Sequence, residues 1–184
     1  MNKKKRIFII IAVSVIAAAL MALAVFAAWR AGAFLPGWIR WQSAQITENG
    51  PRICLENKKV TVYADGDRAV WESPAGVLVQ DVLFEDIDAD GSRELMLLCW
   101  KIGRYGPVKP KFGAPEVNSW VQHIYIYDWK DQSAHAVWMS SDIGLDGENW
   151  GFDGHELTLT EPSGRETKWA WYDWGLELSE EVKK

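Results

Sequence analysis

The chain has 184 residues, a formal net charge of −5 at pH 7 and two cysteines. Four of its twenty basic residues precede Ile7, so the remainder carries 16 basic and 25 acidic residues, a charge of −9. Such an acidic surface repels phosphate backbones and anionic headgroups, which argues against nucleic acid as a partner.

An apolar segment comes first along the chain. Residues 7–28 are apolar except for Ser14, and a helix of this length spans about 33 Å, enough to cross a bilayer core. Three lysines and Arg6 precede it, and short basic flanks tend to remain in the cytoplasm. The sequence therefore predicts a cytoplasmic basic tail over residues 1–6 and a transmembrane signal anchor over residues 7–29, in contact with membrane lipid. The expected location is the cell membrane, single-pass, with the C-terminal domain extracytoplasmic.

A cleaved secretory signal is the alternative to an anchor. A basic start, an apolar stretch and small residues such as Ala22, Ala24 and Ala33 occur in such signals as well. The stretch is longer than the roughly 7 to 15 apolar residues of a signal peptide, which favours the anchor. Both interpretations export the rest of the chain.

Beyond a juxtamembrane linker expected over residues 30–50, the composition changes. Short runs rich in Val, Ile, Tyr and Trp are separated by Asn, Asp, Gly and Pro, which is typical of strands and turns. The sequence predicts a β domain over residues 51–178 and a charged tail over residues 179–184. Strands are predicted over residues 53–56, 59–64, 68–72, 77–85, 94–100, 120–127, 135–139, 156–160 and 167–174.

A weak internal repeat runs through the β domain. Residues 62–73 resemble residues 126–140, because both contain a β-branched residue and Tyr followed by Ala-Val-Trp. Each copy is followed by an Asp-Gly turn, at Asp90 and at Asp153. A closed propeller needs at least four blades. We therefore expect a mostly β fold, a small antiparallel domain built from two propeller-blade-like repeats and arranged as a sandwich or a partial-propeller stack.

The strongest local motif is the acidic segment at residues 86–95, Asp-Ile-Asp-Ala-Asp-Gly-Ser-Arg-Glu-Leu. Carboxylates at alternate positions, a Gly for a sharp turn and a further acid can surround one Ca²⁺ with oxygen atoms. The alternative is an acidic turn whose Asp side chains cap its own main-chain amides. The predicted ligands are the side chains of Asp86, Asp88 and Asp90, the main-chain carbonyl of Ser92, and a direct or water-mediated oxygen of Glu94.

The flanks of this loop decide which kind of calcium site is expected. Leu97 stands where an EF-hand has its bidentate Glu, and both flanks are typical of strands rather than helices. A strand-loop-strand with the pattern Asp-x-Asp-x-Asp-Gly-x-x-acid-Leu resembles the FG-GAP and VCBS repeats of exported and adhesive proteins, specifically over residues 82–100. That resemblance implies Ca²⁺ binding within a β-propeller.

A second resemblance covers a wider part of the chain. The anchor, together with the Trp-containing segments 36–41, 100–106 and 171–175, resembles small single-pass membrane proteins of Clostridia-type bacteria. This resemblance implies a lineage and no activity.

The two cysteines, Cys54 and Cys99, lie in apolar runs. In an exported domain they could form a disulfide, which would contribute about 4 kcal/mol in the chain-entropy model. Two free thiols in strands are the alternative.

Tryptophan is the most overrepresented residue, with twelve copies. Trp71 and Trp138 recur in the repeat and are expected in the core. Trp120, Trp150 and Trp174 lie beside Asn, Gly or Asp and are the candidate ligand-binding residues, because exposed indoles stack on sugar rings. The alternative is that all of them fill a thin β core.

No catalytic residues are predicted. The three histidines lack metal-ligand spacing, and neither a nucleophile elbow nor a phosphate loop is present. The expected function is a membrane-anchored extracytoplasmic binding or scaffold module with one structural Ca²⁺, facing envelope glycans or a membrane-protein partner. The alternatives are a sensory or accessory subunit of an envelope enzyme complex, and a carbohydrate-active enzyme that pairs Glu85 or Glu94 with Asp142.

Overall fold

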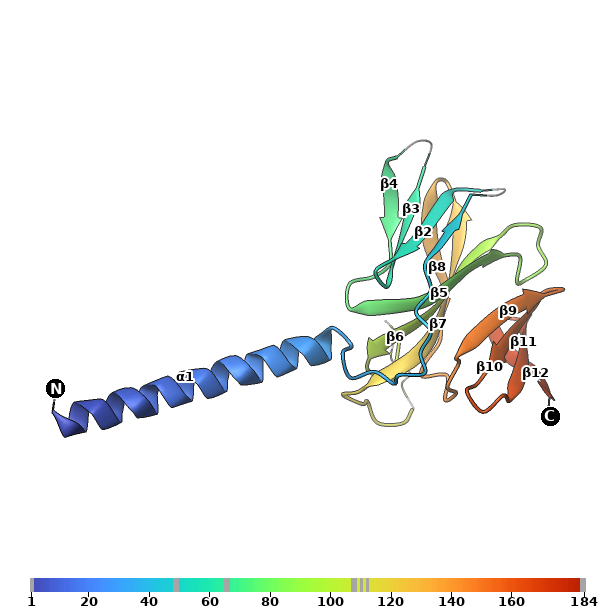
Figure 1. Cartoon of the computed structure of the whole chain (residues 1–184). Coiled ribbons are helices and arrows are strands. Elements are labelled where there is room, and N and C mark those ends of the chain that lie inside the picture. The colour runs from blue at the N-terminus through green and yellow to red at the C-terminus, as the bar shows by residue number, and fades with distance from the viewer. Residues whose placement is uncertain are drawn as a thin grey trace. The chain divides into compact units, whose positions relative to one another are not determined.

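The computed structural model describes residues 2–47, 50–64, 67–106, 109, 111 and 113–182. The chain divides into two compact units, residues 1–36 and residues 37–184. The first contains the helix α1 (Lys3–Arg30), and the second contains all the strands (Figure 1). Residues 183 and 184 of the predicted charged tail lie outside the described part of the chain.

Helix α1 has no polar face. Its side chains from Ile7 to Ala28 are apolar in every direction except for Ser14, and large ones such as Phe8 and Met21 are exposed. Asn2 caps its start by accepting a hydrogen bond from the main-chain N–H of Lys4 at 3.4 Å, so the helix includes part of the predicted basic tail. Within the described residues, α1 is the one helix long and apolar enough to span a membrane. The predicted apolar helix is therefore confirmed.

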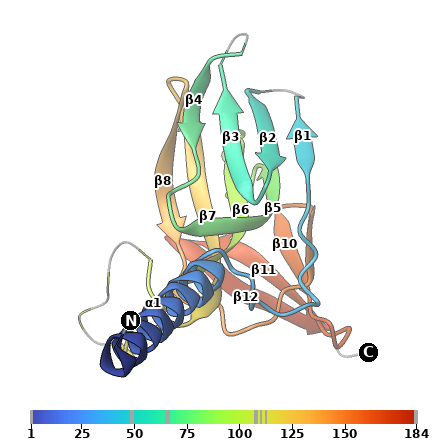
Figure 2. The same ribbon diagram turned by 60° about the vertical axis from the view of Figure 1, so that its left-hand side comes forward.

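The strands form three antiparallel sheets, and each sheet consists of four strands that follow one another in the sequence. Sheet 1 contains β1–β4, sheet 2 contains β5–β8 and sheet 3 contains β9–β12; Figure 2 shows β1 to β4 side by side in that order. The predicted mostly β, antiparallel fold is confirmed. The strands are β1 (Ala44–Ile46), β2 (Arg52–Glu56), β3 (Lys59–Tyr63), β4 (Ala69–Glu72), β5 (Val77–Glu85), β6 (Glu94–Ile102), β7 (Trp120–Lys130), β8 (Ser133–Met139), β9 (Asn149–Asp153), β10 (Glu156–Thr160), β11 (Glu166–Tyr172) and β12 (Gly175–Val182).

Three of these strands are missing from the sequence prediction. β1 lies within the expected linker, β9 has a turn-like composition, and β12 continues past the predicted end of the domain at residue 178. Each of these three strands obtains its main-chain hydrogen bonds from an adjacent strand; in β9, for example, Trp150 pairs with Leu159 of β10. Pairing overrides weak local propensity in such strands.

The internal repeat corresponds to equivalent positions in consecutive sheets. In sheet 1, Val62 pairs with Trp71 and the register then shifts by one residue; in sheet 2, Ile126 pairs with Trp138 and the register shifts at the same point. The hydroxyls of Ser73 and Ser140, two residues after each Trp, accept main-chain N–H groups in the same way, at 3.2 and 2.8 Å. Sheet 3 has the same shift after Lys168, which pairs with Glu180 instead of a Trp.

Sheet 2 supplies side chains to two separate apolar clusters. Alternate residues of β6 point to opposite faces, so Leu97 packs with sheet 1 in the first cluster while Leu98 packs with sheet 3 in the second. Trp71 joins the first cluster by an edge contact with Tyr127, with ring centroids 4.9 Å apart. Trp138 packs against the second, so both repeat-related indoles lie at the core, as predicted.

Neither cysteine forms a disulfide in the structure. Cys99 is buried in the first cluster, whereas Cys54 lies on the opposite face of β2 from the buried Ile53 and Leu55. The bridge allowed by the sequence is therefore not formed, because the two side chains point to different sides of sheet 1.

A buried amide network joins sheet 2 to the segment before β9. Gln80 occupies a bulge in β5, between Val79 and Asp81, and bulges redirect a side chain. Its amide accepts hydrogen bonds from the indole of Trp100 at 2.8 Å and from Gln122 at 2.9 Å. Both glutamines donate to the carbonyl of Gly147. The network fixes the chain that leads into sheet 3.

Part of the predicted linker belongs to the β domain. Ile39 is buried, and Trp38 contacts Trp100 with ring centroids 5.8 Å apart. The main-chain N–H of Gln42 donates to the carbonyl of Gln80 at 2.9 Å. Within the linker expected over residues 30–50, Trp38, Ile39 and Gln42 are thus packed into the β domain, and residues 44–46 form β1.

Candidate functional site

The acidic loop connects β5 to β6, the first two strands of the middle sheet. Ala89 and Gly91 both have positive φ angles, of 60° and 90°, which allow the chain to turn sharply. The carboxylate of Asp86 accepts the main-chain N–H groups of Asp90 and Gly91, each at 3.1 Å. The loop therefore has the self-capping expected of an acidic turn.

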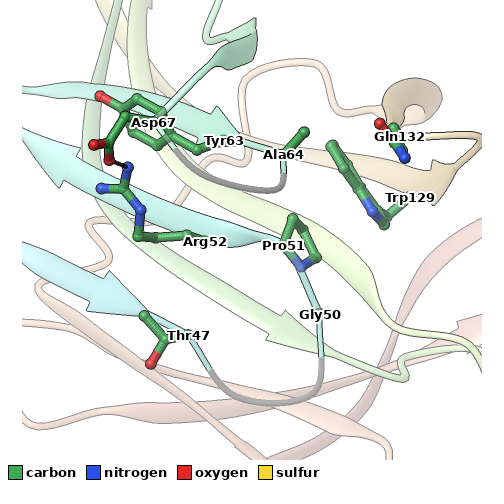
Figure 3. A pocket seen from close by; sticks show the side chains of 9 residues that line it. All are labelled: Thr47, Gly50, Pro51, Arg52, Tyr63, Ala64, Asp67, Trp129 and Gln132. Atoms are coloured by element: carbon green, nitrogen blue, oxygen red, sulfur yellow. Dashed lines mark hydrogen bonds and ion pairs between the residues drawn. The ribbon is translucent and has the colours of Figure 1, made fainter.

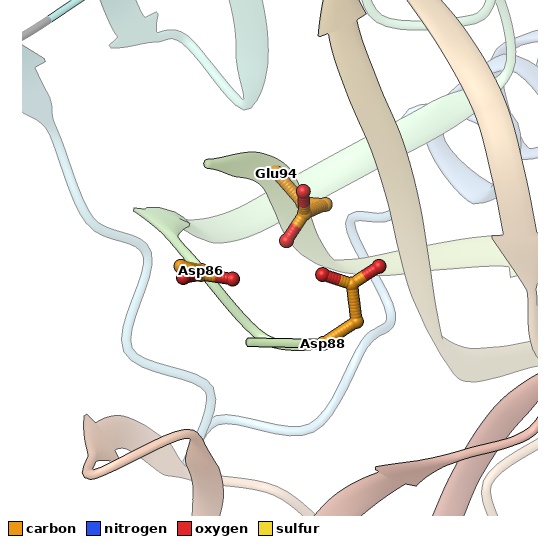
Figure 4. A group of neighbouring side chains, drawn as sticks. All are labelled: Asp86, Asp88 and Glu94. Atoms are coloured by element: carbon orange, nitrogen blue, oxygen red, sulfur yellow. The ribbon is translucent and has the colours of Figure 1, made fainter. Parts of the chain in front are cut away.

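Three carboxylates converge inside this loop. One oxygen each from Asp86, Asp88 and Glu94 lies within 4.8 Å of the others, and Figure 4 shows the three side chains directed toward a common space. Oxygen ligands lie about 2.3–2.6 Å from a Ca²⁺ ion, so ligands on opposite sides are about 5 Å apart. The separation in the loop fits one such ion.

The structure places the other two predicted ligands differently. Asp90 accepts the N–H of Ser92 at 2.7 Å, so its carboxylate is turned toward its own main chain. It still lines a cavity of about 240 Å³ together with Asp88 and Glu94. Ser92 is a donor to Asp90 here, and its predicted role as a carbonyl ligand stays a prediction.

The acidic motif did not predict a further carboxylate beside the loop, that of Asp128. Asp128 of β7 pairs with Glu94 across the strands and lines the same cavity. The motif gives no signal for it because Asp128 comes from a distant segment that strand pairing brings alongside. Like charges opposite one another destabilise a sheet unless a cation compensates them.

Glu94 has an unusual electrostatic environment. It is only 4% exposed, and burial raises its pKa to about 7, with further contributions from the negative charges of Asp88, Asp90 and Asp86. The main-chain N–H of Ile87, which donates to it at 3.0 Å, opposes this shift. Glu94 and the three aspartates of the loop take part in none of the ion pairs found between described residues. A cation in the loop would lower the electrostatic cost of ionising Glu94.

The second acidic turn, between β9 and β10, packs against the first. A ring nitrogen of His155, Nδ1, lies 2.6 Å from the carbonyl oxygen of Asp86. This contact links sheet 3 to the candidate metal loop.

The three candidate tryptophans do not form one surface. Trp120 and Trp150 are partly buried in β7 and β9, and Trp150 packs against the second apolar cluster. Trp174 is 75% exposed in the turn between β11 and β12. Trp150 thus contacts the core, and its role as a ligand-binding residue stays a prediction.

A different indole, Trp129, lines an open groove that the sequence did not indicate. The groove has a volume of about 560 Å³. Figure 3 shows Trp129 and Gln132 to one side of Pro51, with Arg52 and Asp67 on the other. Residues 48–49 and 65–66, in the connections beside it, lie outside the described residues. We call this surface, lined by Thr47, Gly50, Pro51, Arg52, Tyr63, Ala64, Asp67, Trp129 and Gln132, the Trp129 groove.

Charged groups are held in place at one side of the Trp129 groove. The guanidinium carbon of Arg52 lies 3.9 Å from the ring centroid of Tyr63, and its Nη2 lies 2.6 Å from the carboxylate of Asp67. The groove thus presents an indole together with a hydrogen-bond donor, Arg52, and an acceptor, Asp67.

Comparison with known proteins adds no functional evidence. No protein-family model, no curated protein and no solved structure matches the chain.

Proposed function

We propose that this protein is a membrane-anchored extracytoplasmic binding or scaffold module whose β domain is ordered by one Ca²⁺ in the loop between β5 and β6. The observation that carries the proposal is the convergence of Asp86, Asp88 and the buried Glu94 within 4.8 Å. A divalent ion there would offset the repulsion among these carboxylates and would hold together the connection between two strands of the middle sheet.

The membrane placement is supported by α1 and its flank. The helix is apolar all round, and Lys4, Lys5 and Arg6 lie at its N-terminal end. By the positive-inside tendency, the β domain faces the exterior. Extracellular calcium modules bind with dissociation constants of about 10⁻⁴–10⁻³ M, which suits a small open loop.

The arrangement of the sheets supports a relationship to FG-GAP and VCBS repeats. Three sheets of four consecutive strands share a register shift, and the acidic loop joins the first two strands of one of them. We propose that they are three blade-like units instead of the two expected from the sequence repeat.

The calcium proposal predicts a single binding site. Titration of the full chain in detergent with CaCl₂ is expected to give one transition with a dissociation constant of about 10⁻⁴–10⁻³ M by calorimetry. Asp88→Asn removes one of the three converging charges and is expected to weaken binding at least tenfold.

The matched control is Asp131→Asn. Asp131 is exposed in the turn between β7 and β8 with a φ of 52°, which Asn tolerates, so calcium binding is expected to be unchanged. No heat from the folded wild-type chain at millimolar CaCl₂ would leave only an acidic turn.

The proposed contact with envelope glycans uses the Trp129 groove. An indole can stack on a sugar ring, while Arg52 and Asp67 offer a donor and an acceptor to neighbouring hydroxyls. Retention of the full chain on cell-wall polysaccharide is expected to fall at least fivefold with Trp129→Ala. Tyr172→Ala, at an exposed aromatic side chain outside the groove, is the control and should retain full binding. Equal losses in the two variants would argue against the groove.

A sensory or accessory subunit is the second candidate, and one observation favours it. The segment after the anchor is packed into the β domain, where Arg40 forms an ion pair with Glu148 at 2.7 Å and Gln42 bonds to Gln80. A displacement of this segment by a membrane partner would be transmitted directly to the amide network.

A further inference from the structure

A cavity of about 220 Å³ lies between sheet 2 and sheet 3, apart from the acidic loop and the Trp129 groove. Its apolar lining is buried, since Ile124, Leu159 and Leu176 are 2%, 1% and 9% exposed. Trp138 and Trp169 also line it, together with the partly buried Asp142. The cavity therefore has a mainly apolar lining with one acidic residue.

The internal repeat allows this cavity between sheets 2 and 3 to be compared with the equivalent place between sheets 1 and 2, where aromatic rings are in contact. Trp138 corresponds to Trp71, because each pairs with the residue before the register shift. Trp169 corresponds to Tyr127, because each directly follows that shift. Trp71 and Tyr127 pack edge to face between sheets 1 and 2. The corresponding pair between sheets 2 and 3 flanks a cavity instead.

Trp138 is held in its position by the neighbouring sheet. Its indole nitrogen lies 2.6 Å from the point that a Cβ on Gly175 would occupy, so only glycine allows this approach. Asp142 is fixed as well, by the N–H of Gly144 at 3.1 Å and by Arg104 at 3.3 Å. The groups around the cavity are thus positioned before any ligand arrives.

The chemistry of these groups selects a class of ligand. Indole faces attract cations, and the carboxylate of Asp142, which pairs with Arg104 at 3.3 Å, is the acidic group of the lining; Arg104 itself is not among the lining residues. The volume is below the roughly 300–1,000 Å³ of drug-sized sites, so the ligand must be small. The apolar lining favours a cation that carries methyl groups rather than a hydrated metal ion.

We propose that this cavity binds a small alkylated ammonium group, with its methyl groups against Trp138, Trp169 and the apolar lining and its positive charge near Asp142. The acidic β domain attracts such cations from solution. This inference is independent of calcium binding and of glycan contact.

The test compares two ligands of nearly the same shape. The full chain in maltoside detergent is titrated calorimetrically with choline and with 3,3-dimethylbutan-1-ol, which replaces the charged nitrogen by carbon. Choline is expected to bind at least tenfold more tightly. Equal binding would reduce the site to an apolar cavity, and failure of choline to bind would also overturn the proposal.

Variants locate the site. Trp169→Leu and Asp142→Asn are each expected to weaken choline binding at least fivefold, and Asp142→Asn preserves shape if the first variant folds poorly. Tyr172→Leu, at an exposed aromatic side chain outside the cavity, is the control and should bind normally. Unchanged binding in folded Asp142→Asn, or an equal loss in Tyr172→Leu, would overturn the assignment.

Nanodiscs distinguish the source of the ammonium group. Choline binding in phosphatidylglycerol discs that is lost in phosphatidylcholine discs would identify a lipid headgroup as the occupant. Binding in both kinds of disc would indicate a free small molecule. Either result supports the ammonium site, whereas loss of binding in both would contradict it.

Discussion

Replacing Gln122 by Leu is expected to lower the free energy of unfolding by about 3–5 kcal/mol. Gln122 is 2% exposed, and its amide accepts the N–H of Gly147 and donates to the carbonyl of the same residue, both at 2.8 Å. Leu has a similar size but leaves the Gly147 N–H buried without that acceptor. Urea unfolding of the full chain in detergent, followed by tryptophan fluorescence, measures the change.

The same substitution at an exposed site is the control. Gln45 lies exposed in β1, and Gln45→Leu is expected to change the free energy of unfolding by less than about 0.5 kcal/mol. If Gln122→Leu also stayed within about 1 kcal/mol of the wild type, the amide network would contribute little to joining sheets 2 and 3.

Without calcium, lowering the pH from 7.5 to 5.5 is expected to add about 2 kcal/mol to stability through Glu94. Its pKa rises from 4.5 to about 7 in the folded state, so the folded chain binds more protons than the unfolded chain between these values. Stability from this group therefore increases as the pH falls from about 7 toward 4.5 and is lost as the pH rises through 7. The measurement is the free energy of unfolding at both pH values with a chelator present.

Glu94→Gln isolates this contribution, because Gln does not titrate. His123 works in the opposite direction, since burial lowers its pKa and acid then favours the unfolded chain. The difference between wild type and Glu94→Gln cancels that effect and should retain the change of about 2 kcal/mol. A difference that does not vary with pH would show that Glu94 titrates normally.

Local patterns allowed much of the fold to be predicted. The apolar run predicted α1, and the predicted bounds of β5 and β10 agree with the structure, because each lies between clear turn signals. β9 was missed because Asn, Gly and Asp in Asn149–Asp153 are typical of turns. It forms a strand because β10 supplies its hydrogen-bond partners.

The residues of the candidate sites also fall into two groups, those that one local segment predicts and those that only the fold brings together. Asp86, Asp88 and Glu94 were predictable because one short loop carries all three. Asp128, the Trp129 groove and the cavity beside Trp138 depend on which strands pair and which sheets pack, and no single segment encodes those contacts. The contact of Trp150 with the second apolar cluster could not be predicted for the same reason, since its neighbours there come from other strands.

The sequential order of the strands has a consequence for how the chain acquires its structure. Every ladder found among the described residues joins strands that are neighbours in the sequence. Apart from the longer connection of residues 103–119 between β6 and β7, the meanders close short loops, which carry a small entropic cost. A nascent chain, made from its N-terminus, can complete β1–β4 before β5 exists. Its apolar face then stays uncovered until β5–β8 arrive, because the two sheets bury that cluster together. The half-made domain is therefore the species most exposed to aggregation during biogenesis.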